Sequence, residues 1–144
     1  MNHVRIILSG LALLLATQLS FAQSSPIGVW KTIDDETGEA KSHLEIYEQD
    51  GKLHGKIVKL LQVAEDKTCD LCPGDKKDAP LMGMVLLWDL KEYRDYWSYG
   101  SILDPNNGKT YKCNVWMDGE DKLKVRGYIG VSALGRTQEW YRIK

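Results

Sequence analysis

The sequence predicts an all-β domain in which eight antiparallel strands close into an up-and-down barrel. Apolar and polar residues alternate with a period of two in segments bounded by Gly, Asn and Asp, as in strands with one buried face. Most connections between these segments are of hairpin length, whereas the alternative, a two-sheet Greek-key sandwich, needs long crossovers. No segment has a helical period of useful length. A closed barrel also removes the unpaired edges that an open sheet would leave.

The alternation is clearest in the last third of the chain. Odd positions of 111–117 are apolar, and the turn residues of 118–121 follow. Residues 123–129 alternate again, the glycine-containing segment 130–135 makes the next bend, and 136–143 forms the last strand. A sheet of this kind needs a second layer for its apolar face, so the preceding chain must supply it.

The preceding chain supplies five more predicted strands. Asp50-Gly51 is a strong hairpin signal, and Pro105 to Gly108 is a strong turn. Residues 90–95 are predicted to form a turn. The strands predicted between these turns are 28–33, 41–48, 53–61, 83–89 and 96–102.

One connection, residues 62–81, is far longer than the others and lies between the third and fourth strands. Connections in compact domains are usually about 4–6 residues, and much longer ones are functional or disordered. This loop carries Cys69-Asp70-Leu71-Cys72. We therefore expect it to form a lid over one end of the barrel.

The first 22 residues are predicted to be a secretory signal peptide. A positive charge at Arg5 precedes an apolar stretch, and Ser20 and Ala22 are small residues at the −3 and −1 positions of a cleavage site. A retained N-terminal anchor is the alternative; the apolar stretch is short for an integral membrane span. Gln23 follows the predicted cut, so no cysteine is available for lipidation. We expect a single domain at 23–144, periplasmic or secreted.

The composition excludes some functions. The formal net charge of −1 lacks the basic footprint of a nucleic-acid binder. His43 and His54 flank a hairpin without a serine in a nucleophile-elbow setting, and no glycine motif opens a helix. We find no catalytic constellation and predict neither an enzyme nor a cofactor.

The three cysteines, Cys69, Cys72 and Cys113, allow three interpretations. In an exported protein a structural disulfide is favoured, joining either loop cysteine to Cys113 or the loop cysteines to each other. A thiol-exchange pair is the second, although no helix follows to lower a thiol pKa. A zinc site, completed by His54 or His43, is the third, and no histidine lies near the pair in sequence.

Several strand residues are candidates for contacts with a small ligand. Arg126 and Tyr128 share one strand face and would make a polar anchor if that face points inward; outward placement is the alternative. The aromatic residues of the fifth strand and the methionine-rich face of the fourth have the same ambiguity. The candidates are Arg126, Tyr128, Trp97, Tyr99, Met84 and Arg136.

Two sets of residues resemble known families. Gly28-x-Trp30 in the first strand, with Arg142 in the last, resembles the calycin pattern of lipocalins and avidins, in which the tryptophan plugs the barrel and the arginine packs across it. A longer set resembles the bacterial family called domain of unknown function 2147. It comprises Gly28-Val29-Trp30, Cys69-x-x-Cys72, Leu81-x-Gly83 and residues 102–105, 108–113, 123–130 and 135–140. This resemblance implies an exported, lipocalin-like barrel with no settled activity, ligand or catalytic residue.

The sequence therefore predicts a barrel that binds one small apolar or amphipathic molecule, with the long loop as its lid. A thiol-active envelope protein and a structural or interaction barrel with an envelope partner are the alternatives.

Overall fold

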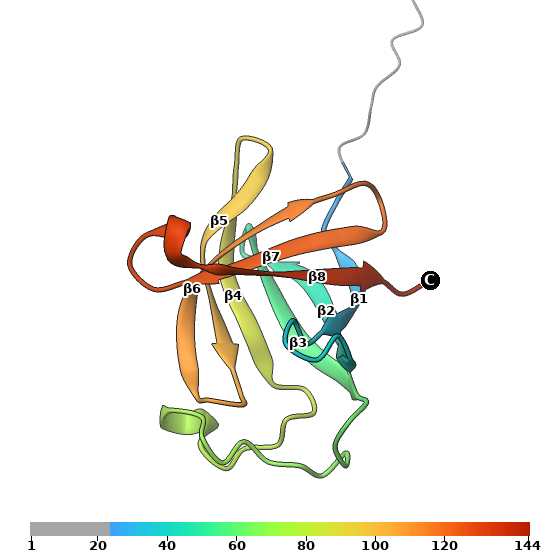
Figure 1. Ribbon diagram of the computed structural model, residues 1–144, viewed down its shortest axis with the longest axis vertical. Coiled ribbons are helices and arrows are strands. Elements are labelled where there is room, and N and C mark those ends of the chain that lie inside the picture. Colours follow the sequence, from blue (N-terminus) through green and yellow to red (C-terminus); the bar gives the residue numbers. More distant parts are fainter. Residues whose placement is uncertain (1–23) are drawn as a thin grey trace, which may run out of the picture.

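The structure, a computed structural model, describes residues 24–144. The predicted signal peptide lies outside the described residues. Each strand pairs antiparallel with the next, and β1 pairs with β8, so the sheet closes into a barrel (Figure 1). The strands are β1 (Gly28–Ile33), β2 (Ala40–Gln49), β3 (Lys52–Leu60), β4 (Val85–Tyr93), β5 (Tyr96–Asp104), β6 (Lys109–Met117), β7 (Lys122–Tyr128) and β8 (Arg136–Arg142). The predicted eight-stranded up-and-down barrel is confirmed.

The period-two alternation of the sequence becomes the inner face of the barrel. Leu44 and Ile46 of β2 are buried, as are Leu123 and Val125 of β7, while the residues between them are only partly buried. Trp140 of β8 lies opposite Leu123 in the register and is buried with it. One apolar cluster thus lines the interior, and the partly buried residues that alternate with its members in β2 and β7 face outward.

β4 differs from the prediction, which placed a turn at 90–95. The strand continues to Tyr93, and only Arg94 and Asp95 make the turn. Leu90 is fully buried and pairs with Leu53 of β3. Asp89 has a φ of 61°, and this irregularity brings both Leu87 and Leu90 to the inner face although they are three residues apart. The interrupted alternation explains why the prediction of a turn is wrong.

The two ends of the barrel carry different connections. The β2–β3, β4–β5 and β6–β7 turns lie at one end, which we call the closed end. Both ends of the described chain also lie there: Arg142 donates to the Ser25 carbonyl, and Lys144 pairs with Asp121 of the β6–β7 turn at 2.9 Å.

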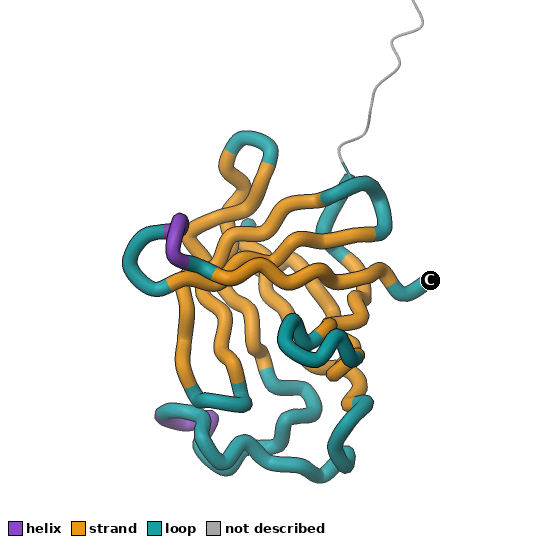
Figure 2. The backbone as a smooth tube through the Cα atoms, viewed as in Figure 1, coloured by secondary structure: helices purple, strands orange, loops and turns teal. Residues whose placement is uncertain are grey.

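The other four connections lie at the opposite end, which we call the open end (Figure 2). They join β1 to β2, β3 to β4, β5 to β6 and β7 to β8, and two of them contain short 3-10 turns, η1 (Gly74–Lys76) and η2 (Ser132–Leu134). No helix within residues 24–144 is long and apolar enough to cross a membrane.

Candidate functional site

The closed end is filled by Trp30 and Arg142. Trp30 is completely buried, and its indole Nε1 donates to the Pro26 carbonyl at 2.8 Å. The guanidinium of Arg142 lies 4.3 Å from the centre of the Trp30 ring, a cation–π distance. Gly28 makes room for it: its φ is 140°, and a Cβ there would lie 2.7 Å from Arg142 Nη1.

Arg142 also ties the segments of this end together. Its guanidinium donates to the carbonyls of Glu120, Ile27 and Ser25 at 2.8, 3.0 and 2.7 Å. These bonds join the last strand, the segment before β1 and the β6–β7 turn. The end is therefore sealed by the chain itself.

The open end contains a cavity of about 570 Å³. This volume lies within the range of pockets that hold small molecules. Its deep walls are aliphatic and aromatic side chains from six strands. They are Leu44, Ile57, Leu86, Ile102, Leu103, Val125 and Trp140.

Polar groups enter this cavity from β1, β2 and β8. The hydroxyls of Thr32 and Ser42 are buried and lie 2.8 Å apart. Gln138 Oε1 accepts from the indole Nε1 of Trp140 at 3.0 Å, and Gln138 Nε2 donates to Asp35 Oδ1 at 3.3 Å. A line of hydrogen bonds thus runs from the apolar interior to a carboxylate at the mouth.

A second, polar chamber of about 230 Å³ adjoins the cavity. Seven residues line both spaces, so the two lie side by side and share one wall. All nine residues that line it are charged or carry side-chain amides: Asp34, Asp35, Glu36, Lys41, Asp104, Asn106, Asn107, Arg136 and Gln138. The open end therefore combines a large apolar space with a small polar one.

Arg136 holds the β1–β2 loop against β8 at the mouth of the cavity. Its guanidinium donates to Asp35 at 2.6 and 2.9 Å and to Glu36 at 3.2 Å. The hydrogen bonds to Asp35 raise the pKa of the guanidinium, so it keeps its charge. The backbone N–H groups of Glu36 and Thr37 donate to Asp34 and lower the pKa of its carboxyl. This ion pair is exposed, so an anionic ligand group could compete for Arg136.

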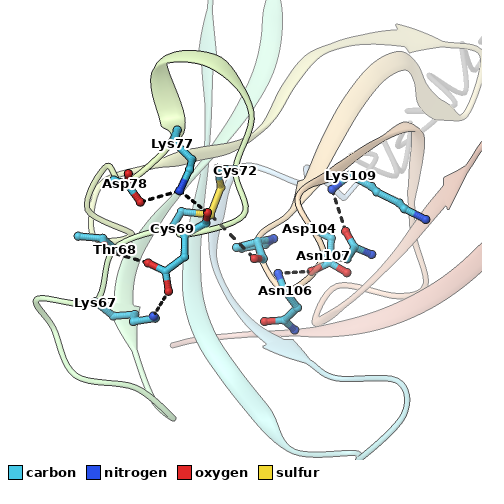
Figure 3. Close-up of a disulfide and its surroundings, with 12 residues drawn as sticks. Lys67, Thr68, Cys69, Cys72, Lys77, Asp78, Asp104, Asn106, Asn107 and Lys109 are labelled. Atoms are coloured by element: carbon cyan, nitrogen blue, oxygen red, sulfur yellow. Dashed lines mark hydrogen bonds and ion pairs between the residues drawn. A yellow bond between two sulfur atoms is a disulfide. The ribbon is translucent and has the colours of Figure 1, made fainter.

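The β3–β4 loop, residues 61–84, lies across the open end and contains a disulfide between Cys69 and Cys72 (Figure 3). Cys69 exchanges backbone hydrogen bonds with Ala79 and Asp78, each 2.9 Å long. Lys77 Nζ donates to the Asp70 carbonyl at 2.7 Å. The loop is thus an ordered structure with its own hydrogen bonds.

The same loop is seated on the β5–β6 turn. Cys69 Sγ lies 3.9 Å from the Pro105 carbonyl oxygen, and a Cβ at Gly108 would collide with the carbonyl of Leu71. Gly108, with a φ of 70°, therefore allows both the turn and the close approach of the loop. This contact fixes one side of the loop above the cavity.

The cysteines are paired within the loop, which is one of the three predicted pairings. Cys69 and Cys72 are each only 2% exposed, so a partner thiol does not reach them in the folded protein. Cys113 is a buried free thiol on β6, and burial raises its pKa to about 12. Within residues 24–144 no three His, Cys, Asp or Glu side chains are placed to hold a metal ion.

Two of the six predicted ligand contacts, Tyr128 and Arg136, line the cavity. Arg126 points outward and donates to Ser132, Ala133 and Thr137 around the β7–β8 loop.

The other three do not line the cavity. Met84 and Trp97 are buried in the core, and Tyr99 is 69% exposed on β5 near the closed end. Tyr99 packs edge-on against Tyr93, whose ring centre is 5.9 Å away.

Sequence reasoning missed most of the polar groups at the cavity. Thr32 and Gln138 lie two residues from Trp30 and Trp140, so the alternation alone places each on the same inner face. Asp35 and Lys41 had no such signal, because Asp35 lies in the β1–β2 loop and Lys41 at the very start of β2, where the alternation does not fix a direction.

The described chain is thus a closed antiparallel barrel, plugged at one end by a tryptophan and an arginine and hollow at the other, which is a lipocalin-like architecture. The family model described as "uncharacterized protein conserved in bacteria (DUF2147)" matches residues 28–142, so the chain belongs to this family, as its motifs predicted.

A solved structure has the same fold. It is titled "Protein HP1028 from the human pathogen Helicobacter pylori belongs to the lipocalin family", and it matches with a TM-score of 0.74 and 22% identity over 84% of each chain. No curated protein matches the chain.

Proposed function

We propose that this protein binds one small amphipathic molecule, with the apolar part in the cavity and the polar end in the adjoining chamber. The observation that carries this proposal is that an apolar space and a polar space lie side by side at the open end of a barrel whose other end is plugged. We expect a binding protein rather than an enzyme.

The apolar part of the ligand is supported by the walls of the cavity. Val125, Leu44 and Trp140 come from three strands and present apolar surface to it. Burial of apolar ligand surface contributes about 25 cal/mol for each Å² removed from water. A cavity of about 570 Å³ lies within the range of sites that hold small molecules, and the ligand that we propose is of the size class of a fatty acid or a small isoprenoid.

The polar end is supported by the chamber that Asp35, Lys41 and Arg136 help to line. Both signs of charge are present there, together with the side-chain amides of Asn106 and Asn107. Such a lining hydrogen-bonds a polar headgroup and excludes a wholly apolar one, since an unpaired polar group in a dry site is costly. The β3–β4 loop would cover the bound molecule.

We further propose that the protein acts in the periplasm or outside the cell, on the basis of the signal-peptide pattern of residues 1–22. A disulfide in the β3–β4 loop is consistent with an oxidising compartment. Thiol exchange is not supported as the activity, because both sulfur atoms are buried.

The first experiment asks what the native protein carries. The protein is purified from its own envelope fraction without detergent, extracted with organic solvent and analysed by mass spectrometry. The expected result is one class of amphipathic molecule in near-stoichiometric amount. An extract with no enriched molecule, combined with failure to bind a dansyl-labelled fatty acid, would contradict the proposal.

The second experiment fills the cavity. Val125→Phe adds volume to the cavity wall and should weaken binding of the dansyl-labelled fatty acid about tenfold, because overpacking a site costs more than 1 kcal/mol. Val58→Phe makes the same change on the exposed outer face of β3 and is the matched control. Energy transfer from the tryptophans to the dansyl group reports binding, and its loss in Val125→Phe but not in Val58→Phe assigns the probe to the cavity. Equal binding by both variants would place the probe elsewhere.

A further inference from the structure

Among the connections of the open end, the β7–β8 loop, residues 129–135, combines an uncharged sequence with exposed aliphatic side chains. Its sequence, Ile-Gly-Val-Ser-Ala-Leu-Gly, contains no charge. Ile129, Val131 and Leu134 are 63%, 60% and 79% exposed. Figure 2 shows this loop, with its short helical turn, projecting beyond the neighbouring strands. Three exposed aliphatic side chains on one projecting, uncharged loop form an apolar patch.

Several backbone groups of this loop are hydrogen-bonded within the protein itself. Arg126 donates to the carbonyls of Ser132 and Ala133 at 2.8 and 3.3 Å. The N–H groups of Leu134 and Gly135 donate to carbonyls within the loop, each at 3.1 Å. Transfer of an unpaired backbone group into an apolar medium costs several kcal/mol. These bonds remove that cost for five backbone groups of residues 131–135, so this part of the loop is suited to leave water.

The patch is continuous with the cavity. Ile129 and Leu134 line the mouth of the cavity while they are also exposed to solvent. Val131 lies between them in sequence and does not line the cavity. An apolar surface therefore leads from the interior of the barrel to the tip of the loop.

The charges around the open end favour one kind of lipid surface over another. The β1–β2 loop (34–39) and the β3–β4 loop (61–84) together contain nine Asp and Glu residues and three Lys residues. Excess negative charge repels a surface of anionic lipid. It is complementary to the ammonium groups that zwitterionic phospholipids present to water.

We propose that the β7–β8 loop inserts its apolar side chains into the surface of a bilayer of zwitterionic phospholipid and sets the open end of the barrel against the lipid. This interaction does not depend on which molecule the cavity binds, or on whether it binds one. It gives the protein a lipid-docking surface in addition to its internal site.

The test measures flotation of the full mature protein with vesicles of phosphatidylethanolamine and phosphatidylcholine. The wild-type protein should float with the vesicles, and Val131→Asp should reduce the partition coefficient about tenfold, since it removes an exposed aliphatic group that the bilayer would bury and adds a charge. Tyr99→Asp is the matched control: it makes the same kind of change at a 69% exposed residue near the closed end. Asp also adopts the positive φ of residue 99 more readily than Tyr does.

The salt and lipid dependence separates insertion from charge attraction. Binding through the apolar loop should persist in 1 M salt and should weaken when phosphatidylglycerol replaces the zwitterionic lipid. Absence of wild-type flotation, binding that requires phosphatidylglycerol and disappears in salt, or equal losses in Val131→Asp and Tyr99→Asp would each overturn the proposal. A dimer that Val131→Asp dissociates, without vesicle binding, would assign the loop to a second copy of the chain instead.

Two readouts keep this proposal distinct from ligand binding. Near-UV circular dichroism should be unchanged in Val131→Asp, because the side chain is exposed. Binding of the dansyl-labelled fatty acid without vesicles should also be unchanged, because Val131 does not line the cavity. If Val131→Asp loses flotation and still binds the fatty acid, the docking surface is supported. If the wild-type protein floats with the vesicles and does not bind the fatty acid, the ligand proposal alone is contradicted.

Discussion

The two ends of the barrel are built from the same strands and differ in what their polar groups contact. At the closed end the Arg142 guanidinium donates to three backbone carbonyls and covers a buried indole. At the open end Arg136, six residues earlier in the same strand, pairs with exposed carboxylates of a loop beside a cavity. At the closed end the arginine is hydrogen-bonded to backbone carbonyls of the chain itself, whereas the open end leaves polar and apolar surface available to a ligand. Stability and binding are thus separated along one strand.

The largest loss of stability is expected from a substitution of Trp30 at the closed end. Trp30→Ala removes a fully buried indole and should lower the free energy of unfolding by about 3–5 kcal/mol. Urea denaturation followed by circular dichroism measures this loss. A loss below about 1 kcal/mol would mean that the closed end collapses around the gap and that the plug is not central to the fold.

Substitutions of the two arginines of β8 compare the closed end with the open end directly. Arg142→Gln should lower the free energy of unfolding by about 2–3 kcal/mol, because three carbonyls lose a charged donor. Arg136→Gln should cost less than about 1 kcal/mol, because its ion pairs are exposed. Affinity for the dansyl-labelled fatty acid should fall more in Arg136→Gln than in Arg142→Gln. Equal stability losses in the two variants would contradict the division of roles.

The disulfide tests the open end alone. Replacing Cys69 and Cys72 together by Ser should cost about 2 kcal/mol in the chain-entropy estimate for so short a loop. Hydrogen exchange should speed up at the amides of Cys69 and Leu81, which donate within the β3–β4 loop, and stay slow in β6 and β7. Uniform acceleration throughout the barrel would show that the loop is part of the global folding unit.

The smallest effect is expected at Cys113. Burial raises the pKa of its thiol to about 12, against 9.0 for an ordinary cysteine, so the folded state retains a proton that the unfolded state loses. The contribution of this thiol to stability is therefore full below pH 9 and declines as the pH rises above it. At pH 8 the native protein should show no reaction with a thiol reagent, and the unfolded, unreduced protein should show one thiol. In Cys113→Ala the alkaline decline should be shallower; an unchanged slope would assign it to other groups.

The closed end was predictable from the sequence to a degree that the open end was not. Trp30 and Arg142 lie within regular strands, where alternation and a family pattern place them together, and the structure has them in contact. The strands themselves follow the period-two pattern, apart from β4 and β5, where the positive φ values of Asp89 and Tyr99 interrupt it.

The open end joins residues that are about 100 apart in sequence, such as Asp35 and Arg136. They meet only after the barrel has closed, so no local spacing reports their contact. The outward direction of Arg126 was likewise left open by the pattern, because a strand has two faces and both Arg126 and Tyr128 suit either. The sequence therefore predicts the strands of the barrel well and the residues that line its cavity poorly.

Ser25 and Lys144 both lie at the closed end, held there by Arg142 and Asp121. A tag attached at either residue therefore emerges on the side away from the mouth. Protein immobilised on a sensor chip through such a tag would present its entrance to the flowing solution, so vesicles and soluble amphiphiles could be compared on one surface without steric interference from the support.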